Sequence, residues 1–519
     1  MRTSLRFVLL AVVTSLVWPF SLYGAPLYKI TVQIDPTGGG TVLLDPQKDG
    51  YAKNNIVTVS ASPATGMTFI GWGGALSGTQ NPTTLRVSGN QTVIAHFATD
   101  SGGGGTNPPP PSGTLPTKGM VVGYFAQWTI YRRGYLPKHV ASSGAVQQLN
   151  VLNYAFAAPD ATLKCASLDT FADYGKRFDA TESVDGVADT VSQPLKGNFN
   201  QILKLKKLNP RLRVLISLGG WTESYRFSDA ALPANREAFV ASCIDMFVKG
   251  NVAAGVSAAG VFDGIDVDWE YPGSCGATCD YRLEDKQNFI ALLAEFRKQL
   301  GVLGQTNGRQ YLLTVAAPAG YAQYSKMDLP GIAPYVDWVN VMAYDFHGGW
   351  ETAGPTNHSS ALFQSTCEKP DGDWADKAIK AYVGALIDPA KVVLGMPFYG
   401  HGWRTSNVPP GLCLAATGVP RGTYEKGVED YEVLAARYAP SFQDDKTGTQ
   451  WTFDGSTFWS FDDLTSAPWK ADYANCRGLR GMMIWELSGD DSNGSLLTGM
   501  STQLRNDNSA CHSVWLPLP

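Results

Sequence analysis

From about residue 118 onward, the chain alternates short apolar segments with longer stretches of helical spacing. This alternation is typical of a parallel sheet whose strands are joined by helical crossovers. One crossover helix is clear from five apolar residues that share one face: Phe289, Leu292, Leu293, Phe296 and Leu300. Strand candidates occupy residues 121–125, 151–156, 214–218, 265–270, 312–316, 338–344, 392–396 and 482–485. Eight such strands predict an α/β fold whose sheet closes into a (β/α)8 barrel, the TIM-barrel architecture.

The fourth of these segments carries an acidic residue at every second position. A β-strand directs alternate side chains to opposite faces, so Asp266, Asp268 and Glu270 share one face of residues 265–270. The intervening apolar residues face the other way and are predicted to pack in the core. Carboxyl groups crowded on a buried face cannot all stay ionised. The trio therefore predicts an acid beside a base, at the end of a barrel strand where such barrels carry their chemistry.

Three structural alternatives compete with this interpretation: an N-cap cluster, a calcium loop and a solvated sheet edge. Asp263 is off the strand parity and is expected to be a turn or cap residue. A twelve-residue calcium loop needs a glycine and a distal glutamate that the segment does not supply. No set of His and Cys at ligand spacing accompanies the carboxylates, so we predict neither a metal nor a cofactor.

Residues 1–25 have the layout of a secretory signal peptide. Arg2 and Arg6 precede an apolar run at 7–17 that is too short to span a bilayer, and small residues follow it. We therefore expect a secreted, extracellular protein without a membrane span. Eight cysteines, an even number, suit an exported chain with disulfide bonds. Their pairing is left open, apart from a local bridge between Cys275 and Cys279; Cys243 fits a buried thiol as well.

Residues 26–99 are predicted to form a small all-β domain, with alternating strands at 28–34 and 56–61 separated by Gly, Pro and Asn turns. The TVSASPATGMTFIGW segment and the closing TVIAHF strand resemble the divergent internalin B-repeat modules of bacterial surface proteins. Trp72 is expected in the core of this domain, with a sugar-stacking platform as the alternative. Residues 100–117 are rich in Gly and Pro and are predicted to be a linker. The sequence leaves open whether this module binds the cell surface, an insoluble polysaccharide, or nothing.

The 519 residues carry a formal net charge of -5 and no long run of Lys or Arg. We therefore expect no nucleic-acid partner, and a neutral polymer fits better. Residues 118–519 are predicted to form one catalytic barrel domain, acting as a monomer. The interval at about 402–458, between the seventh and eighth strands, is far longer than a barrel loop needs. We expect a small α+β insertion domain there.

Four motifs in one order resemble family 18 of the glycoside hydrolases, the chitinases. The segment DGIDVDWEYP at 263–272 fits the DxxDxDxE motif of that family, including the Tyr271 that follows it. The strand SLGGW at 217–221 resembles its SxGG strand, and MAYD at 342–345 resembles its M-x-Y-D strand. GMMIWE at 481–486 is similar to the strand that supplies the floor tryptophan. The GTYEKGVEDYEVL segment resembles the insertion domain of one branch of the family, where it forms a wall of a deep groove.

This resemblance implies a retaining, substrate-assisted hydrolysis of the β-1,4 bonds of N-acetylglucosamine polymers, with chitin and chitooligosaccharides as partners. Glu270 is then the general acid and later the base that activates water. Asp268 holds the acetamide N–H of the substrate, and Asp266 shares a proton with Asp268. Tyr344 donates its hydroxyl to the acetamide oxygen. These four residues form the expected catalytic set.

The resemblance also implies a substrate-binding set around Trp485, whose ring offers a flat face to the distorted sugar. Its other members are Asp345, Met342, Tyr271 and Tyr399. Aromatic residues in the loops at the same end of the barrel are candidate subsites for neighbouring sugars: Trp128, Tyr131, Trp221, Trp350 and Trp403. His401 stands where the family usually has Arg after the Tyr-Gly pair. We expect it to change a polar contact near the groove and the pH profile, without taking part in the acid chemistry.

Two other activities suit parts of this pattern. An endo-β-N-acetylglucosaminidase would cut glycoprotein glycans, but such enzymes generally have a simpler, more open barrel than the insertion domain implies. A chitinase-like lectin would bind sugar without cutting it. Such lectins typically lose the acid, whereas Glu270 is present here.

Overall fold

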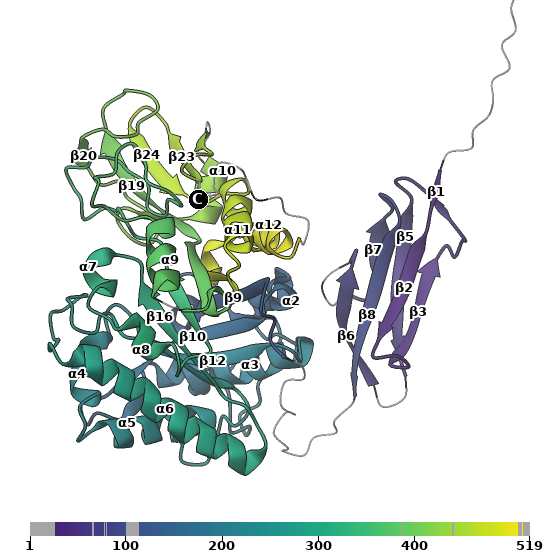
Figure 1. Ribbon diagram of the computed structural model, residues 1–519. Helices are drawn as coiled ribbons and strands as arrows, with labels where there is room; N and C mark the ends of the chain where they lie inside the picture. Colours follow the sequence, from purple (N-terminus) through teal and green to yellow (C-terminus); the bar gives the residue numbers. More distant parts are fainter. Residues whose placement is uncertain are drawn as a thin grey trace, which may run out of the picture. The chain divides into compact units, whose positions relative to one another are not determined.

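The computed structural model describes residues 26–64, 67–76, 78, 80–99, 114–385, 387–437, 441–506 and 511. The predicted signal peptide and residues 100–113 of the predicted linker lie outside the described residues. The chain divides into two compact units, Met1–Ser101 and Gly102–Pro519 (Figure 1). Among the residues that the structure describes, no helix is both long enough and apolar enough to cross a membrane.

The first unit contains two three-stranded sheets. One consists of β2 (Ile30–Asp35), β8 (Gln91–Thr99) and β6 (Met67–Gly74), and the other of β3 (Gly40–Asp45), β5 (Ile56–Pro63) and β7 (Thr83–Arg86). A short pair, β1 (Leu27–Tyr28) and β4 (Tyr51–Ala52), flanks them. The apolar faces of both sheets contribute to one core, which includes Trp72 at 0% exposure. Its indole N–H donates to the carbonyl of Gln80 at 2.9 Å. Trp72 is therefore a core residue and offers no platform to a sugar.

The second unit is built on a closed sheet of eight parallel strands. They are β9 (Met120–Ala126), β10 (Val151–Pro159), β12 (Arg213–Gly219), β15 (Gly264–Asp268), β16 (Leu312–Pro318), β17 (Trp338–Met342), β18 (Val392–Pro397) and β25 (Gly481–Trp485). Each pairs with the next in this order, and β9 pairs with both β25 and β10. The predicted (β/α)8 barrel is confirmed, because the first and last strands close the ring. β11 (Cys165–Ser167) is added antiparallel to β10.

Helices surround the barrel, and the main core lies between them and the sheet. The longer ones are α3 (Gly197–Leu208), α5 (Arg236–Cys243), α6 (Asp285–Asn307), α9 (Ala375–Gly384), α11 (Ser466–Cys476) and α12 (Ser495–Leu504). Single turns and short helices are α1 (Pro137–Ser142), α2 (Ala145–Gln148), α4 (Phe227–Ala230), α7 (Tyr321–Tyr324) and α8 (Leu329–Ile332). Figure 1 shows α6 running along the outside of the barrel. The five apolar residues predicted to share one face of this helix are all buried.

β15 directs its side chains to two faces as its alternation predicts. Ile265 and Val267 belong to the core outside the barrel, whereas Asp266 and Asp268 project into the barrel interior. The strand ends at Asp268, two residues earlier than predicted. The N–H of Glu270 donates to Ser224 Oγ at 2.9 Å instead of to a neighbouring strand. This contact ends the series of hydrogen bonds between β15 and its neighbouring strands. Glu270 therefore stands just beyond the strand end.

Between β18 and β25 the chain forms a second sheet. Its strands are β19 (Tyr399–Thr405), β20 (Ala416–Gly418), β21 (Val428–Asp430), β22 (Ser441–Asp444), β23 (Thr449–Phe453) and β24 (Thr457–Phe461), with α10 (Tyr431–Arg437) beside them. These elements begin before and end after the interval predicted from loop length. The reason is that β19 follows β18 after one residue and pairs antiparallel with β24.

All eight cysteines are paired. The bonds join Cys165 to Cys243, Cys275 to Cys279, Cys367 to Cys413 and Cys476 to Cys511. The local bridge expected between Cys275 and Cys279 is present. The alternative of a buried Cys243 thiol is wrong, because this residue ties α5 to β11. The Cys367–Cys413 bond ties the loop after β17 to the inserted sheet.

The buried position of Trp72 predicts a large effect of its removal on the first unit. We expect Trp72→Ala to lower the free energy of unfolding of that unit by about 3–5 kcal/mol, because it leaves a cavity in a small core. Hydrogen exchange resolved by peptide reports residues 26–99 separately from the barrel. Leu43→Ala is the control, since Leu43 is 58% exposed and should change stability by less than about 0.5 kcal/mol. Equal exchange in the two variants would contradict the assignment of Trp72 to the core.

Candidate active site

Asp266 lies at the centre of a cage of hydrogen-bond donors inside the barrel. Tyr124 Oη and Ser217 Oγ donate to its Oδ2 at 2.7 and 2.8 Å. Thr314 Oγ1 and Asn340 Nδ2 donate to Oδ1, the latter at 3.3 Å. The donors come from β9, β12, β16 and β17, and the strand register places Ser217 and Thr314 directly beside Asp266. Complete burial raises the pKa of Asp266, and these four hydrogen bonds act against that rise.

Asp268, the next inward residue, has no such cage. It is 4% exposed, and its Oδ1 has no hydrogen-bond partner among the described residues. Burial, together with the charges of Glu270 and Asp266, raises its pKa well above the ordinary value. The two neighbours therefore differ in proton affinity, because only Asp266 receives the donors that stabilise a carboxylate.

Glu270 lies at the end of this line of carboxyl groups and is partly exposed. Burial raises its pKa to about 7, against a hydrogen bond from Tyr271 that lowers it, and the charge of Asp345 raises it further. A group with this pKa carries a proton for much of the time at neutral pH and can also give it up. That is the property required of a general acid that later acts as a base.

The tyrosine and aspartate after β17 lie beside the acidic line. Tyr344 is partly buried, and burial followed by the charges of Asp345, Asp268 and Glu270 raises its pKa well above the ordinary value. Its hydroxyl therefore stays protonated and is available as a donor. Asp345 adopts a positive φ of 57° and is 45% exposed. Its Oδ1 lies 2.8 Å from both Tyr399 Oη and His401 Nε2, so the strand β19 fixes its orientation.

Trp485 ends β25 and forms the centre of a group of aromatic rings. Phe156 stacks on it with ring centroids 5.6 Å apart, Tyr124 meets it edge-on at 5.3 Å, and Trp128 lies at 6.4 Å. Met342 is partly buried in the same cluster inside the barrel. The peptide bonds after Ala155, Glu270 and Trp485 are cis. Of the predicted residues, Trp485, Trp128 and Met342 lie in or against this aromatic cluster, which we call the floor, and Tyr124 joins the cluster to Asp266.

The outlying aromatic residues divide into two groups. Trp128, Tyr131, Trp221 and Trp350 are exposed, at 44%, 50%, 54% and 59%. Trp221 lies 6.4 Å from the ring of Tyr271, and Trp350 lies 5.1 Å from that of His401. Trp403 was predicted as a subsite, but it is fully buried in the core of the inserted sheet. Its position within β19, rather than in a loop, places the indole against Phe458, and its N–H donates to Glu351 O.

The sequence did not single out several residues that complete this site. Tyr124, Thr314 and Asn340 hold Asp266, and Phe156 stacks on Trp485. Thr314 and Asn340 are polar residues in otherwise apolar strands, which is a usable signal for inward-facing groups. Phe156 is the last residue of the predicted second strand and carries no distinguishing pattern. Among the described residues, no group of three or more His, Cys, Asp or Glu is arranged to hold a metal ion.

The loop after β9 joins the inserted sheet to the barrel. Arg133 pairs with Asp430, and its guanidinium lies 4.2 Å from the ring centroid of Tyr424. Arg132 donates to the carbonyls of Thr423 and Tyr424 at 2.9 and 3.2 Å. These contacts fix the inserted sheet next to the segment that carries Trp128.

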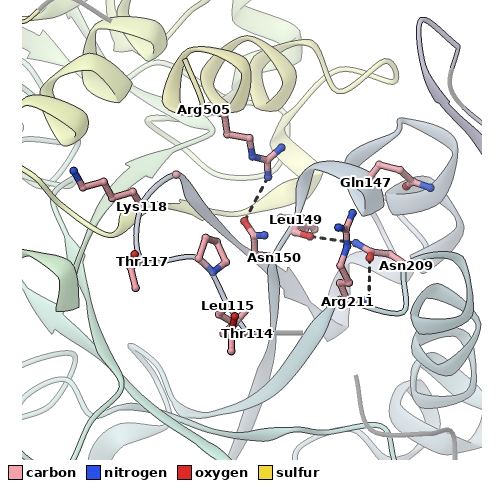
Figure 2. A pocket seen from close by; sticks show the side chains of 12 residues that line it. Thr114, Leu115, Thr117, Lys118, Gln147, Leu149, Asn150, Asn209, Arg211 and Arg505 are labelled. Carbon is pink, nitrogen blue, oxygen red and sulfur yellow. Dashed lines mark hydrogen bonds between the residues drawn. The ribbon is translucent and has the colours of Figure 1, made fainter. Parts of the chain in front are cut away.

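A cavity of about 680 Å³ lies at the opposite end of the barrel. It is lined by residues 114–119 and by residues that precede β10 and β12, as Figure 2 shows. Lys118, Arg211 and Arg505 are its charged lining residues, and none of the described lining residues is acidic. Because it lies at the N-terminal ends of the strands, it is separate from the carboxyl line.

Comparison with known proteins gives two family matches. The model for "Glycosyl hydrolases family 18" matches residues 120–490, and that for "Divergent InlB B-repeat domain" matches residues 30–101. Chitinase C of Streptomyces lividans is 38% identical over 378 residues, covering 72% of this chain and 58% of the relative. Chitinase A1 of Niallia circulans is 35% identical over 421 residues, covering 71% of this chain and 56% of the relative. The chain thus spans less than two thirds of the length of these relatives.

Among solved structures, the catalytic domain of the psychrophilic chitinase B from Arthrobacter TAD20 is 40% identical, with a TM-score of 0.72. The similarity covers 76% of this chain and 97% of that domain. Chitinase ChiA74 from Bacillus thuringiensis is 30% identical with a TM-score of 0.64, over 75% of this chain and 70% of that one.

The raised pKa of Glu270 predicts how its replacement changes stability with pH. A carboxyl group whose folded pKa lies above its unfolded pKa stabilises the fold fully at low pH, and that stability is lost as pH rises through about 7. We therefore expect Glu270→Gln to match the wild type at pH 4 and to exceed its free energy of unfolding at pH 8 by about 2–3 kcal/mol. Urea unfolding at the two pH values measures the difference.

Glu295→Gln is a control of opposite sign. Partial burial opposes a fall in the pKa of Glu295, but hydrogen bonds from Gln299 and Lys298 hold that pKa below its ordinary value. Its removal should therefore lose stability at pH 8 relative to pH 4. If both variants shift in the same direction, the assignment of a raised pKa to Glu270 is wrong.

Proposed function

The chain belongs to family 18 of the glycosyl hydrolases, and we propose that it is a secreted chitinase that cleaves the β-1,4 bonds of N-acetylglucosamine polymers. The observation that carries the proposal is the line of three inward carboxyl groups, in which proton affinity differs from one member to the next. Asp266 is stabilised by four donors, Asp268 has an oxygen without a partner among the residues that the structure describes, and burial raises the pKa of Glu270 to about 7. This is the arrangement that a substrate-assisted hydrolysis requires.

In the first step, the acetamido oxygen of the bound sugar attacks its own anomeric carbon. Glu270 donates its proton to the glycosidic oxygen as that bond breaks, so the leaving sugar departs as an alcohol. Asp268 accepts a hydrogen bond from the acetamido N–H through the Oδ1 atom that has no partner among the described residues. Its negative charge then offsets the positive charge that develops on the oxazolinium ring.

Asp266 and Tyr344 prepare the attack: Asp266 controls the proton of Asp268, and Tyr344 orients the acetamido oxygen. The four donors to Asp266 keep it in the acceptor form, so the proton shared by the pair is on Asp268 before substrate arrives. When the acetamido group binds, this proton moves from Asp268 to Asp266 and leaves Asp268 as the anion. Tyr344, which stays protonated, donates to the acetamido oxygen and fixes its direction of attack. Water then opens the oxazolinium ring from the vacated side, and Glu270 takes the proton of that water.

The floor around Trp485 supplies the binding energy. Its ring faces the apolar side of a pyranose, and Trp128 and Trp221 are exposed aromatic surfaces for sugars on either side. Tyr399 and His401 hold Asp345 beside the acid. Because these proposed binding surfaces are aromatic rings, they can bind a sugar that carries no charge, which agrees with a neutral polysaccharide as the substrate.

The role of Glu270 predicts a loss of hydrolysis without a loss of binding. We expect Glu270→Gln to lower kcat on chitin oligomers by roughly 10²–10⁴-fold, because the amide has the shape of the acid but no proton to give. Binding of the oligomers, measured by calorimetry, should stay within a few-fold of the wild type. Glu295→Gln, on the outer helix α6, is the matched control and should keep full kcat. Undiminished kcat in Glu270→Gln would overturn the assignment of the acid.

The substrate-assisted route also predicts the stereochemistry of the product. Two successive inversions at the anomeric carbon retain its configuration, so the β-anomer of the new reducing end should appear first. Proton NMR during the first minutes of hydrolysis distinguishes it from the α-anomer, which grows later as the sugar mutarotates. Initial appearance of the α-anomer would show direct attack by water and would exclude this mechanism.

A further inference from the structure

A buried carboxyl group that the mechanism does not use is linked by hydrogen bonds to the aromatic floor. Asp173 is in the single helical turn η2 (Phe171–Gly175) and is 1% exposed. Its Oδ1 accepts from Tyr154 Oη at 2.5 Å and from Gln127 Nε2 at 3.3 Å, and its Oδ2 accepts from Ser167 Oγ at 2.6 Å. All three partners are donors, as an ionised carboxylate requires.

Gln127 connects this carboxyl group to the floor. Its Oε1 accepts the backbone N–H of Phe156 at 2.7 Å. Phe156 stacks on Trp485, and Trp128, the next residue after Gln127, lies 6.0 Å from Phe156 and 6.4 Å from Trp485. The amide side chain of Gln127 thus links Asp173 to Phe156, and its backbone leads directly to Trp128, so two of the three rings around Trp485 depend on this residue.

The groups that face Asp173 are neutral, apart from one. β10 contributes Tyr154, β11 contributes Ser167, and α3 contributes Asn198, which donates to Tyr154 Oη at 3.0 Å. Asp169 is the charged neighbour that acts on it, and it is itself bound by Tyr131 Oη at 2.6 Å. Burial raises the pKa of Asp173 to about 7, hydrogen bonds from Ser167 and Tyr154 lower it, and the charge of Asp169 raises it again. The group therefore changes charge near neutral pH.

We propose that Asp173 is a positioning residue whose charge controls how firmly Gln127 holds Phe156 and Trp128 around Trp485, and thereby the affinity of the floor for the sugar polymer. The proposal rests on the function proposed above. A hydrogen bond to an ionised carboxylate is about twice as strong as one to a neutral group. Protonation weakens the long bond to Gln127 first, so the floor binds sugar more tightly above pH 7 than below it.

The test separates this residue from the acid by working in the Glu270→Gln background, where Glu270 no longer titrates. We expect the Kd of a chitin tetramer for Glu270→Gln to fall three- to tenfold between pH 6 and pH 8. The double variant Glu270→Gln/Asp173→Asn should bind weakly at both pH values, because the amide resembles the protonated acid. Asp268 is present in both proteins, so the difference between them reports Asp173.

Two further variants keep the test independent of a folding defect. Glu270→Gln/Gln127→Met removes the same link from its other end and should also flatten the pH dependence. Glu270→Gln/Asp179→Asn alters an exposed carboxylate of the same segment and should leave the dependence unchanged. In the active enzyme, Asp173→Asn should raise KM severalfold and leave kcat within about twofold, a split that a merely unstable variant would not give.

The outcomes distinguish the two proposals. If Glu270→Gln binds no chitin tetramer at any pH, the proposed function fails. If it binds, and the Asp173→Asn double variant shows the same pH dependence, the proposed function stands and the role of Asp173 is overturned.

Discussion

The active site depends on one buried carboxyl group whose two oxygens are both hydrogen-bonded. Asp266 sits where no water reaches it, and an isolated carboxylate there would be strongly unfavourable. Four donors from four different strands make it tolerable. No described residue donates to Oδ1 of the neighbouring Asp268, and burial with the charges of Glu270 and Asp266 raises the pKa of Asp268 well above its ordinary value. The asymmetry between two chemically identical groups is therefore produced by the strands around them.

A second carboxyl group is buried among hydrogen-bond donors, outside the line of Asp266, Asp268 and Glu270. Asp173 is also buried among donors, and in that network the donors lead outward to the aromatic floor. Two buried carboxyl groups are thus surrounded by donors: Asp266 in the line of acidic residues, and Asp173, which is linked through Gln127 to the rings around Trp485. Both connect to Trp485 through neighbours in β9 and β10, since Tyr124 bonds Asp266 and Phe156 is tied to Gln127.

The alternation of apolar and polar residues along the strands was enough to predict most of the fold and the centre of the site. The alternation of β15 is enough to separate Asp266 and Asp268 from the apolar residues between them, because the period of two is a local property of the chain. What failed were features that depend on distant partners. Trp403 was expected in a loop, yet it lies in a strand whose pairing with β24 buries it. The strand end at Asp268 depends on Ser224, and the donors to Asp266 depend on the register of four strands, neither of which the local sequence specifies.

Ring closure has a consequence for the order in which this protein is completed. β9 is the first strand of the barrel, and its partners are β10 and β25, the last strand. A nascent chain that has emerged only as far as residue 480 contains the three carboxyl groups and most of their donors. It still lacks β25, the last strand of the barrel, and with it the indole of Trp485. Pairing over such a sequence separation forms late. Synthesis must therefore pass residue 485 before the ring of strands can close and the aromatic cluster around Trp485 can be complete.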